Sequence, residues 1–429
     1  MKTTHIQTDC NRPYGRQGTF LPVPILTLCL LLATGSGIAQ TYTVLHAFTA
    51  GPDGHTPVAS LLRDNDGNLY GTASGGGAFS YGLVFKMDPH DNSNVLHSFW
   101  AGDGLGPAST LIRDEAGTLY GTTDLGGTPE GGRCAFGCGT VFKLDTTGKL
   151  TVIYAFTGGT DGALPNARLV RDKDGNLYGV TAEGGNNGAC PFSILGTCGV
   201  VFRVDTNGKE TVLHAFSGTD GWTPSGNLLR DKQGNLYGVT LYGGNLSACS
   251  QSGCGTVFKI DAKGRMTTLY SFPGGSGGEY PEGSLAHDSL GNLYGTASGE
   301  PFGADCCGLV FKLDKAGKGV VVYAFQGNPD GSYPVGGVTR DKTGKLYGTT
   351  YAGGTGNCSS EPGCGTIFMI DVNGKETVLY SLSGGSDGFE PEDALIMDHA
   401  GNLYGTASYG GDLSCGFYTG CGVVFKLTP

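Results

Sequence analysis

The sequence predicts an all-β fold, a seven-bladed β-propeller, and three observations predict it. One unit recurs seven times along the chain, at spacings of about 50 to 60 residues. Each unit contains four short runs of β-branched and aromatic residues between turn sequences, with no helical periodicity. The composition, with 79 Gly and 10% aromatic residues, is typical of a chain with many tight turns. Such units stack as four-stranded blades around an axis, because each blade buries its faces against its neighbours.

Three positions define the register of the repeat. An aspartate lies three residues before a glycine, a tyrosine precedes a glycine, and a phenylalanine lies in the third predicted strand of each copy. Each position is the same residue in all seven copies, which chance does not explain. The positions are Asp64, Asp114, Asp172, Asp231, Asp288, Asp341 and Asp398; Tyr70, Tyr120, Tyr178, Tyr237, Tyr294, Tyr347 and Tyr404; and Phe85, Phe142, Phe202, Phe258, Phe311, Phe368 and Phe425.

The third copy illustrates the four predicted strands. They are Ala167–Arg171, Asn176–Thr181, Gly199–Val204 and Glu210–Phe216. Residues 40–429 are predicted to form one propeller domain built from such units.

The ends of the repeat region predict how the ring closes. The region begins with a fourth strand, Thr41–Phe48, and ends with a third strand, Gly422–Leu427. We expect these two strands to pair, so that the N-terminal strand completes the last blade and two exposed edges disappear.

Residues 1–39 are predicted to be a signal peptide. An apolar stretch at 20–33 follows a basic leader and precedes small residues, with cleavage expected before Gln40. An uncleaved anchor is the alternative. No segment of the mature chain approaches the roughly 20 apolar residues of a membrane span. We therefore expect a secreted, periplasmic or cell-surface location, and a monomer.

Charge excludes one class of partner. The formal net charge is −11, and removal of three basic residues and one acidic residue with the leader leaves −13. Because such a surface repels phosphates, neither nucleic acid nor an anionic lipid surface is an expected partner.

The mature chain has 12 cysteines, two in the loop between the second and third strands of each copy from the second to the seventh. An even count, one pair per loop and an export signal together predict local disulfides. A zinc site is the weaker alternative, since its four ligands would have to converge from separate loops, and we expect no metal. The predicted pairs are Cys134/Cys138, Cys190/Cys198, Cys249/Cys254, Cys306/Cys307, Cys358/Cys364 and Cys415/Cys421.

The two faces of the predicted propeller differ in sequence. The turns between first and second strands and between third and fourth strands hardly vary, and we assign them no function. The loops on the other face vary, and each D-G-x-x-P connection there has two free positions before its proline. These positions should ring the channel mouth, where aromatic side chains suit a small polar ligand; the alternative is that they pack on one another. The predicted ligand-binding residues are His55, Trp222, Glu279, Tyr280, Tyr333, Phe389 and Glu390.

Acid/base candidates lie on the same variable face, and any two of them would suffice for a catalytic pair. No spacing rule selects among them. The sequence has no phosphate-cradling loop, H-E-x-x-H or G-x-S-x-G motif, so no cofactor is expected and the catalytic residues stay unknown. The candidates are His55, Asp124, Glu183, Glu279, Asp305, Glu390 and Asp412.

The repeat unit, for example LVRDKDGNLYGVTAEGG followed by CGVVFRVDTNGKETVLHAF, resembles the Gloeo/Verruco (GloVer) tandem repeat of exported bacterial proteins. The resemblance extends over essentially all of residues 41–429. It implies an exported repeat protein without an assigned activity, often with a C-terminal surface anchor, which we do not expect after Pro429. The strand order is also similar, more distantly, to NHL-like and streptogramin-lyase-like propellers.

These observations favour a recognition module that binds a saccharide, peptide or protein on its variable face. A propeller lyase or glycoside hydrolase with acid/base residues on that face is the alternative, and a structural envelope protein is the second alternative. A binding role is favoured over an enzymatic one, because no catalytic motif stands out in the sequence.

Overall fold

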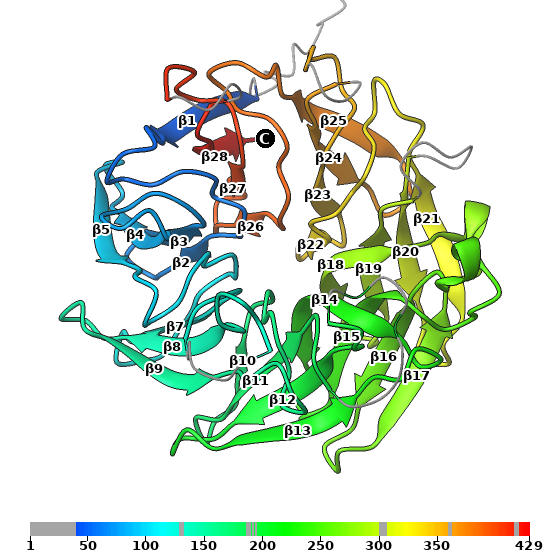
Figure 1. Cartoon of the computed structure of the whole chain (residues 1–429). Helices are drawn as coiled ribbons and strands as arrows, with labels where there is room; N and C mark the ends of the chain where they lie inside the picture. The colour runs from blue at the N-terminus through cyan, green and yellow to red at the C-terminus, as the bar shows by residue number, and fades with distance from the viewer. Residues whose placement is uncertain are drawn as a thin grey trace, which may run out of the picture. The chain divides into compact units, whose positions relative to one another are not determined.

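In the computed structural model, the described residues are 40–127, 133–185, 190, 193, 195–299, 307–358, 363–415 and 420–429. They form seven four-stranded antiparallel sheets arranged in a ring, as Figure 1 shows. The predicted seven-bladed β-propeller is therefore confirmed. Among the described residues, no helix is long and apolar enough to cross a membrane.

Blades 1 to 3 each follow chain order from the innermost to the outermost strand. Blade 1 comprises β2 (Leu62–Arg63), β3 (Leu69–Ala73), β4 (Leu83–Met87) and β5 (Ser93–Ser98). Blade 2 comprises β6 (Ile112–Arg113), β7 (Leu119–Thr123), β8 (Thr140–Leu144) and β9 (Leu150–Ala155). Blade 3 comprises β10 (Val170–Arg171), β11 (Leu177–Thr181), β12 (Val200–Val204) and β13 (Glu210–Ala215).

Blades 4 to 6 repeat this order, and two 3₁₀ turns, η1 (Cys249–Gln251) and η2 (Gly275–Gly277), lie in their loops. Blade 4 comprises β14 (Trp222–Arg230), β15 (Leu236–Tyr242), β16 (Thr256–Ile260) and β17 (Met266–Ser271). Blade 5 comprises β18 (Pro281–His287), β19 (Leu293–Ala297), β20 (Leu309–Leu313) and β21 (Gly319–Ala324). Blade 6 comprises β22 (Val338–Arg340), β23 (Leu346–Thr350), β24 (Thr366–Ile370) and β25 (Glu376–Ser381).

Blade 7 closes the ring. It contains β26 (Ile396–Met397), β27 (Leu403–Ala407), β28 (Val423–Thr428) and the N-terminal strand β1 (Thr41–Ala47), in the order β1-β28-β27-β26. The pairing of β1 with β28 is antiparallel along the whole length of β1, and the two strands lie side by side in Figure 1. The predicted closure is confirmed.

Phenylalanines join each blade to the next. The repeated phenylalanine of the third strand is buried in every blade. In blades 1 to 6, a second buried phenylalanine that follows the outer strand of the preceding blade meets it edge to face. Six such contacts cross junctions with ring centroids 5.0–5.4 Å apart. Each is worth about 0.5–1.5 kcal/mol beyond the area that it buries, so the interblade packing repeats around the ring.

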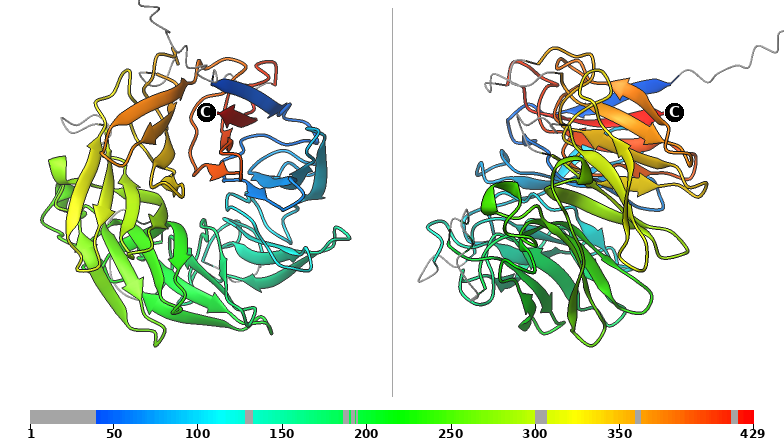
Figure 2. Two further views of the ribbon diagram at one scale, coloured as in Figure 1. Left: turned by 180° about the vertical axis from the view of Figure 1, so that it is seen from behind. Right: turned by 90° about the vertical axis from the view of Figure 1, so that its right-hand side faces the viewer.

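The inner strands are shorter than predicted in five of the blades. In blade 3 the ladder begins at Val170 rather than Ala167. Ala167 and Leu169 are nevertheless buried, so packing rather than sheet hydrogen bonding holds this segment near the axis. Figure 2 shows the ring from behind and edge-on.

The short turns on one face, which we call the turn face, all use the same aspartate cap. In blade 3, Asp172 accepts hydrogen bonds from the Asn176 amide at 2.9 Å and the Tyr178 hydroxyl at 3.0 Å. This is the turn chemistry that the repeat predicts, because an aspartate side chain satisfies backbone donors a few residues ahead. The opposite face, which we call the loop face, carries the loops that vary.

Candidate functional site

Every connection between blades on the loop face holds the residue directly before its proline in the left-handed region. The φ of this residue lies between 49° and 61° in all seven copies. Thr56 and Thr223 are β-branched, for which this conformation is unfavourable. Contacts of the folded protein must therefore impose it. The seven residues are Thr56, Gly106, Leu164, Thr223, Tyr280, Tyr333 and Glu390.

A hydrogen bond from the preceding blade holds each of these residues. The Thr223 amide donates to the Cys198 carbonyl at 3.0 Å, and the equivalent acceptor is the second cysteine of a pair in six of the seven junctions. A glycine follows that cysteine. At Gly199, whose φ is +87°, an added Cβ would lie 2.6 Å from Cδ of Pro224. The cysteine-bearing loops are therefore the joints between blades on this face.

Five of the predicted cysteine pairs are disulfides in the structure: Cys134–Cys138, Cys190–Cys198, Cys249–Cys254, Cys358–Cys364 and Cys415–Cys421. In the sixth pair, Cys307 is described and buried, whereas Cys306 lies outside the described residues.

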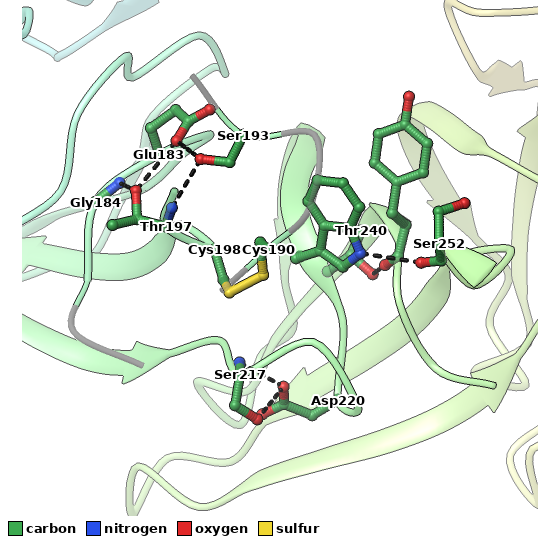
Figure 3. Close-up of a disulfide and its surroundings, with 12 residues drawn as sticks. Glu183, Gly184, Cys190, Ser193, Thr197, Cys198, Ser217, Asp220, Thr240 and Ser252 are labelled. Carbon is green, nitrogen blue, oxygen red and sulfur yellow. Dashed lines mark hydrogen bonds between the residues drawn. A yellow bond between two sulfur atoms is a disulfide. The ribbon is translucent and has the colours of Figure 1, made fainter. Parts of the chain in front are cut away.

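Figure 3 shows how one of these loops is braced. Near the Cys190–Cys198 disulfide, the carboxylate of Glu183 accepts hydrogen bonds from the Ser193 hydroxyl and, at 3.1 Å, from the Thr197 hydroxyl. The Thr197 hydroxyl also accepts the Gly184 amide at 2.8 Å. Glu183, an acid/base candidate, thus has a structural role in ordering the loop.

Two residues of the predicted aromatic rim pack inside the protein. Trp222 is 1% exposed, donates its indole N–H to the Ser252 carbonyl at 3.0 Å and stacks on Tyr242 with centroids 4.4 Å apart. Phe389 is 6% exposed and stacks on Tyr409 at 5.3 Å. These two side chains follow the packing alternative, because their rings have almost no surface left for a ligand.

The other rim aromatics are half-buried. The His55 ring lies 3.0 Å from the Thr56 hydroxyl, and burial lowers the pKa of His55. Tyr280 meets Tyr242 edge to face at 5.4 Å. Tyr280 and Tyr333 both occupy left-handed positions. Their part in binding a ligand stays a prediction.

The predicted acidic residues of the rim are engaged with neighbours. Glu279 is buried, and its Oε2 lies 2.8 Å from Sγ of Cys249. That sulfur belongs to a disulfide, so the cluster of Cys249, Cys254 and Glu279 offers no thiolate to a metal ion. Glu390 is also buried and accepts a hydrogen bond from the Tyr351 hydroxyl.

Of two further acid/base candidates, the structure describes one. Asp412 caps its own turn, with the Ser414 amide 2.8 Å from its carboxylate. Asp305 lies outside the described residues. The remaining candidate, Asp124, is the one that the structure places in a cavity.

A recess of about 640 Å³ occupies the channel mouth on the loop face. Its walls come from all seven blades, and most of the lining residues occupy two positions of the repeat. One is the residue directly after the D-G-x-x-P proline, and the other is the residue directly after the second strand. The side chains and backbones that line it are Val58, Ser74, Ala108, Asp124, Asn166, Ser225, Gly226, Asn227, Glu282, Gly283, Val335, Tyr351, Glu392 and Asp393.

The carboxyl groups of this recess are poorly solvated. Burial raises the pKa of Asp124 to about 7, and its Oδ1 is buried without a hydrogen-bond partner. Burial and the nearby Glu392 raise the pKa of Glu282 to about 7. The pKa of Glu392 is itself raised, mainly by burial, although the Ser408 hydroxyl donates to it at 2.8 Å. Near neutral pH, this recess therefore holds carboxyl groups in both protonated and ionised forms.

Asp393, which also lines the recess, links three blades. Its carboxylate accepts the Ser60 amide at 2.7 Å and the Thr110 hydroxyl at 3.1 Å, from blades 1 and 2. Burial raises its pKa, and these hydrogen bonds oppose the shift. Arg168 of blade 3 is an exposed residue whose pKa is lowered by desolvation, and the charge of Asp393 opposes this lowering. Asp393 is thus a structural link as well as a wall of the recess.

The sequence contained a signal for the residues that line the recess. The position after the repeated proline is Val58, Ala108, Asn166, Ser225, Glu282, Val335 and Glu392 in the seven copies. It varies as much as the two positions before the proline, on which our prediction concentrated. The variable position was visible, but which neighbour points into the channel depends on the left-handed turn in front of the proline.

Comparison with known proteins is consistent with this architecture. The family model described as Gloeobacter/Verrucomicrobia repeat matches residues 34–248, 126–302 and 193–419. No curated protein matches the chain.

Solved structures show the same fold. One is an extracellular domain ascribed to a hybrid two-component system of B. thetaiotaomicron, with a TM-score of 0.53 and 14% identity over 91% of this chain and 41% of that one. Another, ascribed to a one-component system of the same organism, has a TM-score of 0.52 and 15% identity over 90% and 41%. The present chain thus spans about two fifths of the length of these structures.

Proposed function

The chain belongs to the Gloeobacter/Verrucomicrobia repeat family, and we propose on that premise that it is an exported recognition module that binds a saccharide at the channel mouth. The observation that carries this proposal is the recess of about 640 Å³. Its lining differs from copy to copy although the surrounding framework repeats. A ligand-binding surface requires side chains that vary within one concave region while the supporting structure stays the same.

The chemistry of the lining favours hydroxyl groups. Asp124 and Glu282, with pKa values raised to about 7, can donate a hydrogen bond when protonated and accept when ionised. Asn166 and Asn227 add amides that do both. A sugar presents several hydroxyls that each donate and accept, so a single saccharide unit would satisfy groups that water solvates poorly at present.

Export is supported by three features. Five of the cysteine pairs form disulfides, which persist in oxidising compartments. The leader at residues 1–39 has the composition of a signal peptide. The two B. thetaiotaomicron propellers of the same fold are extracellular domains.

A glycan array probed with residues 40–429 tests the proposal. Glu282→Gln and Asp124→Asn should each weaken binding to the captured glycan at least tenfold, because each removes a group that alternates between donor and acceptor. Asp412→Asn, on an exposed turn of the same face, is the matched control and should bind normally. A protein that captures no glycan, or variants that bind as well as the parent, would contradict a saccharide site; binding to a peptide array instead would point to a polypeptide ligand.

One observation favours an enzyme as the second candidate. Glu282 and Glu392 come from blades 5 and 7, yet their charges interact and the pKa of Glu282 rises to about 7, which suits a general acid. Incubation with the captured glycan, followed by product analysis, would separate the two functions. Cleavage that Glu282→Gln abolishes even at glycan concentrations that saturate the variant would establish the enzyme; an unchanged glycan would leave the recognition role.

A further inference from the structure

A cation stacks on a tyrosine at most junctions between blades. The arginine at the end of one inner strand lies over the repeated tyrosine of the preceding blade, with the guanidinium carbon 5.8–5.9 Å from the ring centroid. This is the geometry of a cation–π contact. The pairs are Arg63 over Tyr404, Arg113 over Tyr70, Arg171 over Tyr120, Arg230 over Tyr178 and Arg340 over Tyr294.

The arginine also meets polar groups at these junctions. Tyr404 and Tyr120 each share a hydrogen bond with their arginine. At the first junction, Asp64 accepts the Tyr70 hydroxyl at 3.1 Å, and the charge of Arg113 contributes to the lowered pKa of Asp64. We call this combination of tyrosine ring, tyrosine hydroxyl and capping aspartate the guanidinium seat.

Two junctions have no arginine at this position. Between blades 6 and 7 the residue is Met397, which packs in an apolar cluster with Tyr347. Between blades 4 and 5 the residue is His287, which is exposed and whose Nδ1 lies 3.2 Å from the Asp288 carbonyl. The first substitution fills the seat with an apolar chain, whereas the second leaves it to solvent.

A groove of about 960 Å³ opens at the junction with His287. Its lining includes Tyr237 and Asp231, which keep the arrangement of the other junctions, with the Tyr237 hydroxyl donating to Asp231 at 3.1 Å. Leu229 and Leu269 add apolar wall. The lining comes from blades 4 and 5, which are neighbours in Figure 1. It includes turn residues such as Asp231, Asp288 and Asp314, so the groove lies on the turn face and away from the channel mouth.

We propose that this groove binds an arginine side chain of a polypeptide partner, with its guanidinium in the seat formed by Tyr237 and Asp231. The protein itself holds a guanidinium in five equivalent seats, so the chemistry of the site is demonstrated within the molecule. The volume exceeds that of one side chain and is in the range of sites that hold larger ligands, which favours a segment of chain over a free amino acid. The lining carries the cationic Arg230, Lys232, Lys259 and Lys315 beside Asp231, Asp288 and Asp314, so the seat itself rather than a general attraction of charge favours the guanidinium.

Nearby cations do not exclude a guanidinium. Lys259 lies over the Tyr237 ring, with Nζ 5.5 Å from the centroid. At Tyr294, however, Lys312 and Arg340 lie over the same ring, and Lys86 and Arg113 share Tyr70. A lysine and an arginine therefore share one tyrosine ring at these junctions, so Lys259 over Tyr237 is compatible with a guanidinium over the same ring.

The test compares short peptides that carry one central residue between glycines, titrated into residues 40–429 by calorimetry at low and physiological salt. The arginine peptide should bind at least tenfold more tightly than the lysine or citrulline peptide, because only arginine supplies both the charge and the planar fork. Equal binding of the arginine and citrulline peptides would overturn the proposal. Free arginine that binds as tightly as the peptide would overturn the polypeptide partner.

His287→Arg supplies the decisive variant. The new side chain should fill the seat from within, as at the five other junctions, and so weaken the arginine peptide at least tenfold while the melting temperature stays the same or rises. Met397→Arg, at the other junction without an arginine, is the matched control and should leave peptide binding unchanged. Undiminished binding to His287→Arg would show that the peptide lies elsewhere and would overturn the proposed site. Neither variant touches the channel mouth, so glycan binding is unaffected by either outcome.

Discussion

The two faces of the propeller treat carboxyl groups in opposite ways. On the turn face, burial tends to raise the pKa of Asp172, but hydrogen bonds from Asn176 and Tyr178 outweigh it and hold the pKa below its usual value. On the loop face, Asp124 and Glu282 have fewer donors, and burial raises their pKa to about 7. The turn carboxylates therefore stabilise the fold, whereas the channel carboxyls cost stability. Groups that are retained at such a cost are candidates for function.

Substitution of a glycine by alanine should give the largest difference in stability between the two faces. Gly283, in the recess, has φ +74°, and an added Cβ would lie 2.3 Å from the Gly337 amide nitrogen of the next blade. Gly264, in a turn, has φ +81° with nothing within 4 Å of its added Cβ. We expect Gly283→Ala to lower the free energy of unfolding by about 3 kcal/mol or more and Gly264→Ala by only about 1 kcal/mol.

Denaturant unfolding of both variants measures the difference. The turn variant controls for the left-handed backbone that both glycines share, so the excess loss reports the contact between inner strands. Equal losses would show that blades 5 and 6 can move apart at the channel, and would break the contrast between a crowded channel and open turns.

Removal of a disulfide tests the loop face next. Cys190→Ser together with Cys198→Ser should lower the free energy of unfolding by about 2–3 kcal/mol, because the cross-link closes a loop with a sequence separation of 8 residues. Blade 1 has no cysteine in its loop, so reductant should affect the other blades only. Hydrogen exchange should then show faster exchange of the backbone amides of residues 195–199 and of Thr223. Unchanged exchange at Thr223 would mean that the joint between blades does not depend on the disulfide.

The aspartate cap gives the largest single effect on the turn face. Asp172→Ala removes the acceptor for the Asn176 amide, the Asn176 side chain and the Tyr178 hydroxyl, and should cost about 2 kcal/mol. Asp174→Ala, an exposed position in the same turn, is the control and should change stability by less than about 0.5 kcal/mol. Because the folded pKa of Asp172 is lowered, its contribution is present above the unfolded pKa and is lost as the pH falls through the folded pKa. A parent and Asp172→Ala variant that lose stability equally in acid would refute this role.

Channel carboxyls should show the opposite pH dependence. The folded pKa of Glu282 is raised from 4.5 to about 7, so its contribution is fully present below the unfolded value and is lost as the pH rises through about 7. Glu282→Gln should remove that loss and make the protein about 1–2 kcal/mol more stable than the parent at pH 8. Thermal unfolding between pH 4 and 8, with Asp412→Asn as the control, measures it. A Glu282→Gln variant whose stability follows the parent curve would place the titration in another group.

The residues of the candidate site were only partly predictable from the sequence. The variable face, the cysteine pairs and Asp124 were visible, because each stands out against copies of the same unit. Trp222 and Phe389 were predicted at the mouth, yet each stacks on the residue opposite it at the end of a second strand, Tyr242 or Tyr409. The stacking partner lies in the same blade, on the chain segment that pairs with the connection. The spacing of residues within the connection therefore could not predict it.

What the sequence determined by itself was everything that repeats. The blade number, the strand order, the aspartate turns and the closure of β1 on β28 follow from contacts between residues that are near in the chain or at its two ends, and one pattern read seven times averages out error. Only the tertiary structure decided what the repeats enclose. Glu282 and Glu392 interact because the seven connections place the same repeat position around one axis. Tyr237 has no arginine over its ring because the equivalent residue, 50 positions further on, is His287, whose side chain is shorter. Both proposed sites lie where different residues occupy equivalent positions of the repeat. What such a substitution does depends on the residues that its side chain contacts across the ring or the blade junction, and only the tertiary structure shows these.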